Sequence, residues 1–354
     1  MAHPDYNKTT TTSMETAVSQ YSVDYKSSDA GSSKENKWKN NDFSKYYGFY
    51  HNVGEYKAAI DSFATWCVGQ GYTVFNTRDK ILLDHITGWG EDTFQQILWQ
   101  GIVIKKVGGD SYTEIILDED GDLLNLKPLN VAKMTHITNE KGILLGYEYM
   151  QADGSIKKFK TYEIFHLCNK RVIDEPHGTP ETKSIEWVMN AIEEARRAYR
   201  KIVQRSCIRI LYVDESDTAK LTQINTEYSA GIKNGEILII PCRPEDAKFE
   251  DLLLPPIESI LRWMEYLEDK FYKQLGVPKV VLGGTSENTE ASAKVGVISY
   301  EPIWTMEISE LEKDILNQLG IMIKINKQPS LMDNMQADES ANTGQTKLEY
   351  QGSQ

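Results

Sequence analysis

Basic residues are too few in this chain to balance the acidic ones. The 354 residues include 39 Lys and Arg against 52 Asp and Glu, which gives a formal net charge of -13. A protein that grips DNA by its phosphates is usually basic. The charge therefore counts against a tight DNA-binding protein and allows only weak contact, or contact with DNA that moves.

Long hydrophobic runs and a cleavable leader are also missing. No apolar stretch approaches the roughly 20 residues that a membrane-spanning helix needs. The longest stretch, "ILIIPC", lies at 237–242, and the N-terminus, "MAHPDYNKTTTTSMETA", is polar and shows no signal-peptide pattern. We therefore expect a soluble protein that is made in a cytoplasm and has no membrane partner.

Cysteine is scarce. The four cysteines are far apart and form no C-x-x-C pair, so a disulfide framework is not expected. His166 and Cys168 form one H-x-C pair, but a zinc site needs four protein ligands, or three and a water. The alternation in "EIFHLC" fits a half-buried strand better. The acidic run "DEDGD" at 118–122 lacks the EF-hand spacing and predicts a hairpin turn, so no metal site is predicted.

Catalytic signatures are absent as well. The sequence contains no G-x-x-x-x-G-K-[ST] phosphate loop, no G-x-S-x-G elbow and no H-E-x-x-H pair. The acidic residues are plentiful but scattered. The sequence therefore predicts a protein that is not an enzyme and has no cofactor. A soluble enzyme with an unrecognised site stays as an alternative, which turnover of a small substrate would reveal.

Two polar ends enclose the part of the chain that is expected to fold. Residues 1–40 and 328–354 are rich in polar residues and poor in apolar ones, which predicts a disordered N-terminal arm and a disordered tail. The ordered part is then 41–327.

The first half of this ordered part predicts two helices and then a β-rich region. Apolar residues recur at helical spacing from Tyr56 to Cys67, and a second helix is predicted over 91–101. From 102 to 167 the period changes to two, which predicts the short strands "IVIKKV", "YTEIIL", "LLNLKPL", "GYEYM", "SIKKFK" and "EIFHLC". The turns between them are predicted at Gly109-Asp110, Asp120-Gly121 and Asp153-Gly154.

The second half predicts two amphipathic helices around a small unit. The first helix, 185–205, has acidic residues early and basic residues late, which suits the helix dipole. A strand–helix–strand unit at 207–241 is too small to hold a core by itself, so we expect it to pack against a neighbour such as another copy of the chain. The second helix follows Pro255-Pro256. After a polar loop, a last helix is predicted over 290–319, which Pro302 must kink or interrupt.

Three segments, in this order, carry a resemblance to a known family. They are "YYGFYHNVGEYKAAIDSFATWCVGQGY" (46–72), "LKPLNVAKM" (126–134) with the β-rich 146–185 in which His166 precedes Gly178-Thr179-Pro180, and "KQLGVPKVVLGGTSENTEAS" (273–292). The chain resembles the portal proteins of tailed double-stranded DNA phages and related viruses over about 46–320. No single motif is specific, and the order and spacing carry the resemblance.

The resemblance implies an α+β portal fold that forms rings. The expected parts are a β-rich wing at 41–184, stem helix 1 at 185–206, a small α/β clip at 207–255, stem helix 2 at 256–275, a tunnel-loop region at 276–292 and a long wing helix at 293–327. Many portals carry a further helical crown, and the polar tail implies that a crown is absent or much reduced here.

Three sets of site residues follow from the resemblance. The tunnel loop, which would project into the DNA channel, comprises Gly283, Gly284, Thr285, Ser286, Glu287, Asn288 and Thr289; an ordinary exposed loop is the alternative. The clip interface comprises Leu221, Ile224 and Tyr228. The basic end of stem helix 1 comprises Arg196, Arg197, Arg200, Lys201 and Arg205, which either touch DNA weakly or form a solvated face paired with acidic residues of a neighbour.

Portal proteins form rings, usually of twelve subunits, at one capsid vertex of the virion. The implied partners are further copies of the chain in a dodecameric ring, double-stranded DNA without sequence specificity, the terminase, the major capsid protein and the head–tail adaptor. The implied location is the virion, and the host cytoplasm during assembly. Another ring-forming virion protein, such as an adaptor, is the main alternative, and it would need neither the wing nor the loop.

Overall fold

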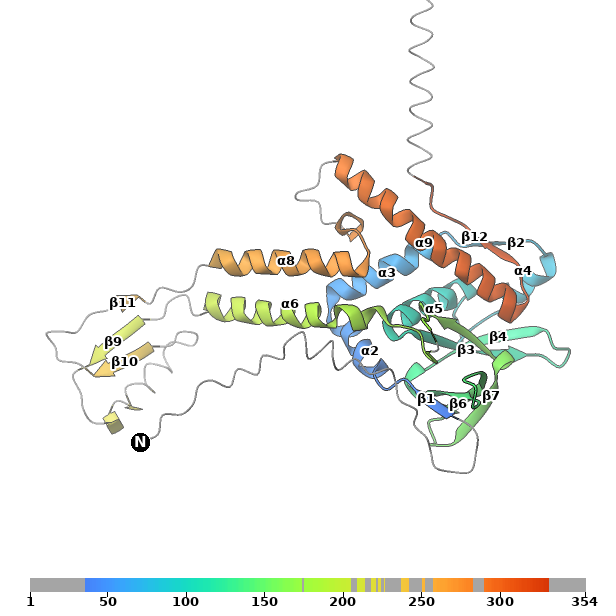
Figure 1. Ribbon diagram of the computed structural model, residues 1–354, viewed down its shortest axis with the longest axis horizontal. Coiled ribbons are helices and arrows are strands. Elements are labelled where there is room, and N and C mark those ends of the chain that lie inside the picture. Colours follow the sequence, from blue (N-terminus) through green and yellow to red (C-terminus); the bar gives the residue numbers. More distant parts are fainter. Residues whose placement is uncertain are drawn as a thin grey trace, which may run out of the picture. The chain divides into compact units, whose positions relative to one another are not determined.

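A computed structural model describes residues 36–173, 175–204, 209–213, 218–220, 222–223, 226, 237–241, 250–251, 257–282 and 290–330. Figure 1 shows how the elements are arranged within each part. The chain divides into two compact units. Unit 1 comprises Met1–Thr182 and Val297–Gln354, and unit 2 comprises Lys183–Gly296.

Unit 1 combines helices with three small antiparallel sheets. Its helices are α2 (Phe43–Asn52), α3 (Gly54–Val68), α4 (Thr77–Asp84), α5 (Phe94–Gly108) and most of α9 (Glu290–Leu319). Its strands are β1 (Asn36–Lys39), β2 (Tyr72–Val74), β3 (Asp110–Leu117), β4 (Leu123–Leu129), β5 (Met134–Thr138), β6 (Leu144–Met150), β7 (Ile156–Lys160), β8 (Ile164–Cys168) and β12 (Ile323–Ile325). The strand orders are β1-β5-β6-β7, β4-β3-β8 and β12-β2.

Two apolar clusters form the core of unit 1. One lies among α2 and the two larger sheets and comprises Phe43, Tyr112, Val131, Met134, Tyr147, Phe159 and Ile164. The other joins α3 to α9, where the rings of Phe63 and Tyr300 lie 6.3 Å apart and those of Trp66 and Trp304 lie 6.0 Å apart. These aromatic contacts on both sides of Pro302 explain why α9 continues through it, so the predicted interruption of the helix does not occur.

Helix α5 corrects the largest error of the sequence-based prediction. The segment "IVIKKV" was expected to be a strand, and it is the second half of a helix that a Thr93–Gln96 capping box begins. The pattern of apolar and polar residues in this segment was misleading, because its two polar residues do not face solvent. The side chains of Lys105 and Lys106 are buried, and the residues are 1% and 6% exposed. Gly109-Asp110 accordingly joins this helix to β3 and is not a hairpin turn, whereas Asp120-Gly121 and Asp153-Gly154 do lie between paired strands.

Other parts of unit 1 also differ from those expected. The arm predicted at 1–40 contains a strand, because Asn36 to Lys39 pair with Thr138 to Thr135 of β5. The last helix occupies Glu290–Leu319, as predicted. The rest of the segment 293–327 is not helical: it forms β12, which pairs with the unpredicted strand β2. The unpredicted helices α2 and α4 are short, and α4 has no continuous apolar stripe that a periodicity search could detect.

A buried ion cluster links α5 to α9. The carboxylate of Glu307 pairs with the ammonium groups of both Lys105 and Lys106, at 2.9 Å for Lys106, and Lys106 also donates to Asn169. Burial alone would raise the pKa of Glu307, but the two neighbouring lysines hold that pKa below its ordinary value. The carboxylate is therefore ionised and ties two helices that are about 200 residues apart in the chain.

Unit 2 contains two long helices and a small sheet. The elements are α6 (Glu181–Gln204, which begins in unit 1), β9 (Arg209–Val213), β10 (Ile237–Pro241), β11 (Glu250–Asp251), α8 (Ile257–Leu275) and η4 (Lys279–Leu282). Strands β9 and β10 pair in parallel, as the predicted strand–helix–strand unit requires, and β11 adds on the other side of β9. Among the described helices of both units, none is long and apolar enough to cross a membrane.

The ion cluster generates a stability prediction. Replacing Glu307 by Gln keeps the shape of the side chain, but it removes the ion-pair partner of the buried Lys105 and leaves Lys106 with only the carboxylate of Glu181, 3.8 Å away. We expect the free energy of unfolding to fall by about 3–5 kcal/mol, measured by urea denaturation at pH 7. The matched control is Glu258→Gln, which removes an exposed pair with Arg262 on α8 and should leave the transition unchanged. A loss under about 1 kcal/mol at Glu307 would show that the cluster is dispensable.

Candidate functional site

Helices α6 and α8 lie side by side in unit 2 (Figure 1). The ammonium group of Lys270 on α8 lies 4.8 Å from the ring centroid of Trp187 on α6. The two helices are therefore in direct contact. Residues Leu267 and Phe271 of α8, and Ile185, Val188 and Met189 of α6, are buried. Both helices are long amphipathic elements that flank the small β9–β10–β11 sheet in the sequence.

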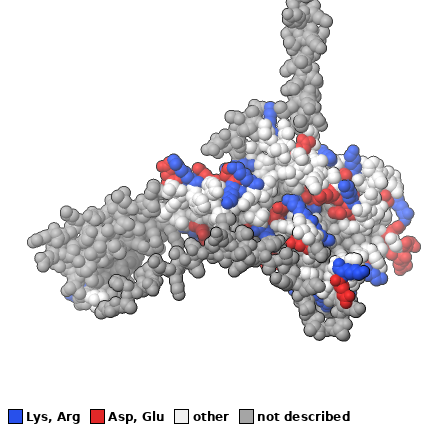
Figure 2. Space-filling model, in the orientation of Figure 1, with Lys and Arg blue, Asp and Glu red and all other residues white. Residues whose placement is uncertain are grey.

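The charges of the two helices are distributed differently. Figure 2 shows acidic and basic side chains interleaved over α8, where Arg262 pairs with Glu258 and Lys273 with Asp269 at i,i+4 spacing. On α6 most acidic residues lie early and the basic end lies late, and Arg197 pairs with Glu193 of the same helix at 3.0 Å. The described part of α8 therefore presents no continuous basic track.

The basic residues predicted on stem helix 1 lie on α6. Arg197 and Arg200 are exposed, and Arg196 is half-buried. The side chains of Lys201 and Arg205 lie outside the described residues. Because Arg197 finds an acidic partner on its own helix, neither DNA nor a neighbouring subunit is needed to balance that charge.

The paired helices also expose large apolar side chains. Trp187 of α6 is 48% exposed, and Leu261, Trp263 and Tyr266 of α8 are 41%, 45% and 53% exposed. The rings of Trp263 and Tyr266 stack with centroids 5.5 Å apart. Leu261 lies about 200° around the helix axis from Trp263. We call the other three residues, Trp187, Trp263 and Tyr266, the aromatic face, because Lys270 lies over the rings of Trp187 and Tyr266. Such a concentration of exposed apolar surface marks an interaction site.

The other predicted site residues fall outside the described part of the chain. These are the tunnel-loop residues from Gly283 to Thr289 and the clip residues Leu221, Ile224 and Tyr228. The two ends of the loop are described, at η4 and at the first turn of α9. They are close together, because a Cβ on Gly296 would lie 3.7 Å from the Pro278 side chain.

A second candidate site is a buried polar cluster in unit 1 that the sequence did not predict. Its centre is Asp110, whose side chain is completely buried at the start of β3. One carboxylate oxygen accepts hydrogen bonds from His166 Nε2 at 2.9 Å and Gly178 N at 3.2 Å, and the other from His177 Nδ1 at 2.8 Å. The cluster thus joins β3, β8 and the segment that leads into α6.

Two tyrosines and a third histidine extend this cluster. Tyr112 OH lies 2.6 Å from His136 Nε2, and Tyr147 OH lies 3.2 Å from His166 Nδ1. The Nε2 atom of His177 is buried without a hydrogen-bond partner. The only sequence signal for the cluster was His166 followed by Gly178-Thr179-Pro180, because the other members are spread from residue 110 to residue 177.

The buried environment shifts the proton affinities of the cluster. Burial would raise the pKa of Asp110, but the hydrogen bonds from His166 and His177 dominate and hold that pKa well below its ordinary value. Burial lowers the pKa of His136 and raises that of Tyr112. At neutral pH the cluster therefore holds an ionised Asp110, a neutral His136 and a protonated Tyr112.

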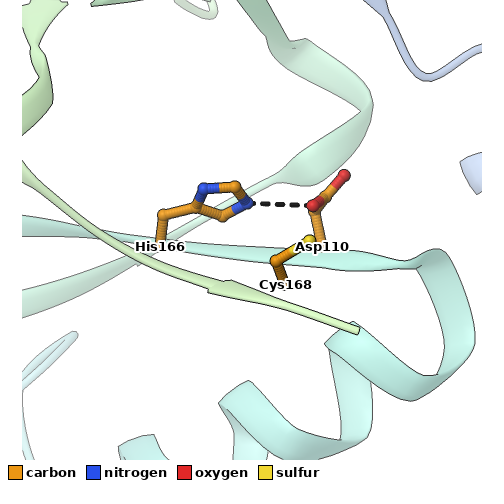
Figure 3. Close-up of side chains that lie close together, drawn as sticks. All are labelled: Asp110, His166 and Cys168. Carbon is orange, nitrogen blue, oxygen red and sulfur yellow. Dashed lines mark hydrogen bonds and ion pairs between the residues drawn. The ribbon is translucent and has the colours of Figure 1, made fainter. Parts of the chain in front are cut away.

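Two overlapping groups in this cluster have the side chains of a metal site. They are Asp110, His166 and Cys168, and Asp110, His136 and His177, with the ligand atoms of each group within 4.8 Å of one another. Figure 3 shows the first group. The sequence had offered only the His166–Cys168 pair, and the structure adds Asp110 from the neighbouring strand.

The comparisons with solved structures identify the fold. The chain matches a chain of the virion of a native gene transfer agent particle at 16% identity with a TM-score of 0.60, covering 87% of this chain and 90% of that one. It matches the neck of the native particle, computed with C12 symmetry, at 14% identity with a TM-score of 0.58 and the same coverage. An HK97-family phage portal protein from Corynebacterium diphtheriae matches at 10% identity with a TM-score of 0.50, covering 76% of this chain and 92% of that one.

These matches confirm the resemblance to portal proteins at the level of the fold. The mixed helix and sheet architecture predicted from the sequence is that of the matched chains. Neither a protein-family model nor a curated protein matches the sequence.

The polar cluster generates a second prediction. Tyr112→Phe removes only the hydroxyl that contacts His136 and leaves a buried ring nitrogen without its partner. We expect a loss of about 1–3 kcal/mol in the free energy of unfolding, measured by urea denaturation at pH 7 in the presence of a chelator. Tyr162→Phe, at a side chain that is 61% exposed, is the matched control. Equal stability of the two variants would contradict the role given to the Tyr112–His136 bond.

Proposed function

We propose that this chain is the portal subunit of a tailed-phage-like particle. In this proposal it forms a ring at one capsid vertex, through which double-stranded DNA is packaged and later ejected. The observation that carries the proposal is the fold match, which extends over both units and covers 87% of the chain for the virion protein. The match to a phage portal protein supports the same assignment independently. The assignment gives the chain a structural role with no reaction to catalyse.

The aromatic face supports assembly into a ring. Three aromatic side chains on α6 and α8 are about half exposed in the single chain, and burying them against another copy would be favourable. Because a ring uses a head-to-tail contact, the face would meet a different surface of the next subunit. The matched neck was computed with C12 symmetry, which supports a ring of twelve copies here.

The charge pattern of the stem supports a channel that lets DNA slide. The described charges on α8 are interleaved, and ion pairs within one helix form on both α6 and α8. Phosphates would therefore meet no continuous basic track, and binding would be weak and independent of sequence. Arg200, which is exposed, is the described member of the basic end best placed for transient contact.

The loop and the small sheet receive the remaining roles in this proposal. The segment from Gly283 to Thr289 would be the tunnel loop, because it joins the end of the stem region to α9. The β9–β10–β11 unit would be the clip that meets the terminase and later the head–tail adaptor. The major capsid protein would surround the ring in the virion, and assembly would take place in the host cytoplasm.

Ring formation generates a prediction about the aromatic face. The double substitution Trp263→Ala with Tyr266→Ala removes the stacked pair, and we expect rings to require about tenfold or more higher protein concentration. Light scattering and electron microscopy of the purified full chain measure this. Glu258→Ala on the same helix is the control and should assemble as the wild type does. A wild-type chain that stays a monodisperse monomer at all concentrations would overturn the proposed function itself.

The loop generates a separate prediction about DNA passage. Replacing 284–289 by a two-residue turn removes polar groups that could touch and release phosphates, and it leaves η4 and α9 in place. We expect normal rings, because loop tips contribute little to core packing, and particles that fail to fill or to retain their genome. The measurement is the DNA content of purified particles. Wild-type filling and retention would favour the alternative of an ordinary exposed loop.

A further inference from the structure

The strand pairing of β3 and β8 places three metal-binding side chains at one point. Asp110 pairs directly with Cys168 across the two antiparallel strands. His166 lies two residues before Cys168 on the same strand and therefore on the same face of the sheet. Figure 3 shows the three side chains gathered there, with His166 Nε2 directed at the Asp110 carboxylate.

The chemistry of this set matches a zinc-class ion. Carboxylate oxygen, imidazole nitrogen and thiolate sulfur are the three ligand types that zinc takes in proteins, at bond lengths of roughly 2.0–2.3 Å. The ligand atoms lie within 4.8 Å of one another, so an ion fits among them once the 2.9 Å contact between His166 Nε2 and Asp110 opens. One carboxylate and one thiolate would neutralise the two charges of the ion, which a buried site requires.

The surrounding hydrogen bonds already orient the ligands. Tyr147 OH lies 3.2 Å from His166 Nδ1 and can accept the ring proton there, which leaves Nε2 free to coordinate. His177 Nδ1 holds the second oxygen of Asp110, and Gly178 N reaches the first. Metal-ligating histidines and carboxylates are characteristically held by such outer partners.

The three ligands lie near a cavity on the described surface of unit 1. The cavity, of about 570 Å³, is lined by His136 and Arg171 among other residues and by none of the three ligands. The His136 ring centroid lies 5.4 Å from that of His166, and Cys168 is itself only half-buried. The proposed ion would enter past one of these two side chains.

We propose that Asp110, His166 and Cys168 bind one zinc-class divalent ion, with water in the fourth position. On binding, the Cys168 thiol releases its proton to solvent and a metal–sulfur bond forms, while the ring proton of His166 moves to Nδ1. The ion cross-links β3 and β8 beside the segment that leads into α6. Because the thiolate is the form of cysteine that ligates a metal, metal binding and proton release are coupled.

The neighbouring group of Asp110, His136 and His177 is the rival site. In that group His136 Nε2 contacts Tyr112 and His177 Nδ1 contacts Asp110, whereas His177 Nε2 has no hydrogen-bond partner. This group also contains a single anionic ligand, so an ion there would leave a buried net charge. We therefore favour the group that contains Cys168.

The test uses the full-length chain, stripped of metal with a chelator and then dialysed. Zinc is titrated by calorimetry in two buffers of different ionisation enthalpy, which also counts the protons released. We expect one zinc ion per chain, about one proton released, and a zinc-dependent rise of Tm. Cys168→Ser and His166→Gln should each weaken binding roughly tenfold or more, and Tyr147→Phe should weaken it by about tenfold.

Two controls keep the proposal falsifiable. His85→Gln removes an exposed histidine on another element, and Cys242→Ser removes a thiol elsewhere in the sequence; neither should change the affinity. Cobalt added to the wild-type chain should give a thiolate-to-metal absorption band, which needs no variant to fold. The absence of that band, zinc binding unchanged in Cys168→Ser, or loss of binding only in His136→Gln would each overturn the assignment.

Discussion

The buried carboxylate of Asp110 is the constraint on which the arrangement of unit 1 most depends. It sits where α5 passes into β3 and accepts hydrogen bonds from β8 and from the segment before α6. The backbone around it is tight: Gly109 has a φ of +90°, and a Cβ there would lie 2.2 Å from the carbonyl oxygen of Gly178. Only glycine, which has no Cβ, fits where the backbones at Gly109 and Gly178 come this close. The ionised carboxylate can stay buried because three donors surround it.

The ion cluster around Glu307 likewise holds α5 in place, where α5 contacts α9. Its partners Lys105 and Lys106 are adjacent in sequence, and each adds a charge that only a buried carboxylate can balance. Together the two clusters fix α5 against β3, β8 and α9. A rigid unit 1 of this kind suits a subunit that must keep its shape while a polymer moves past it, which is the role that we propose.

The charges and apolar side chains of unit 2 are arranged differently from those of unit 1. Its helices carry charges that pair within one helix, and its apolar side chains are in part exposed. A single copy leaves this surface uncovered, whereas the ring that we propose would cover it. In that ring the stability of unit 2 would be linked to assembly, and the amphipathic pattern that predicts a helix would also predict a partner.

The sequence by itself predicted the helices α3, α6, α8 and α9, most strands of unit 1, the strands β9 and β10, and the fold-level resemblance to portal proteins. These depend on local periodicity and on the order of elements, both of which are read along the chain. Only the tertiary structure decided that "IVIKKV" is helical, that residues 36–39 form a strand and that Asp110, His136, His166 and His177 meet. The physical reason is that a buried lysine needs a distant carboxylate, an edge strand needs a partner, and a polar cluster is assembled from strands that only the fold brings together.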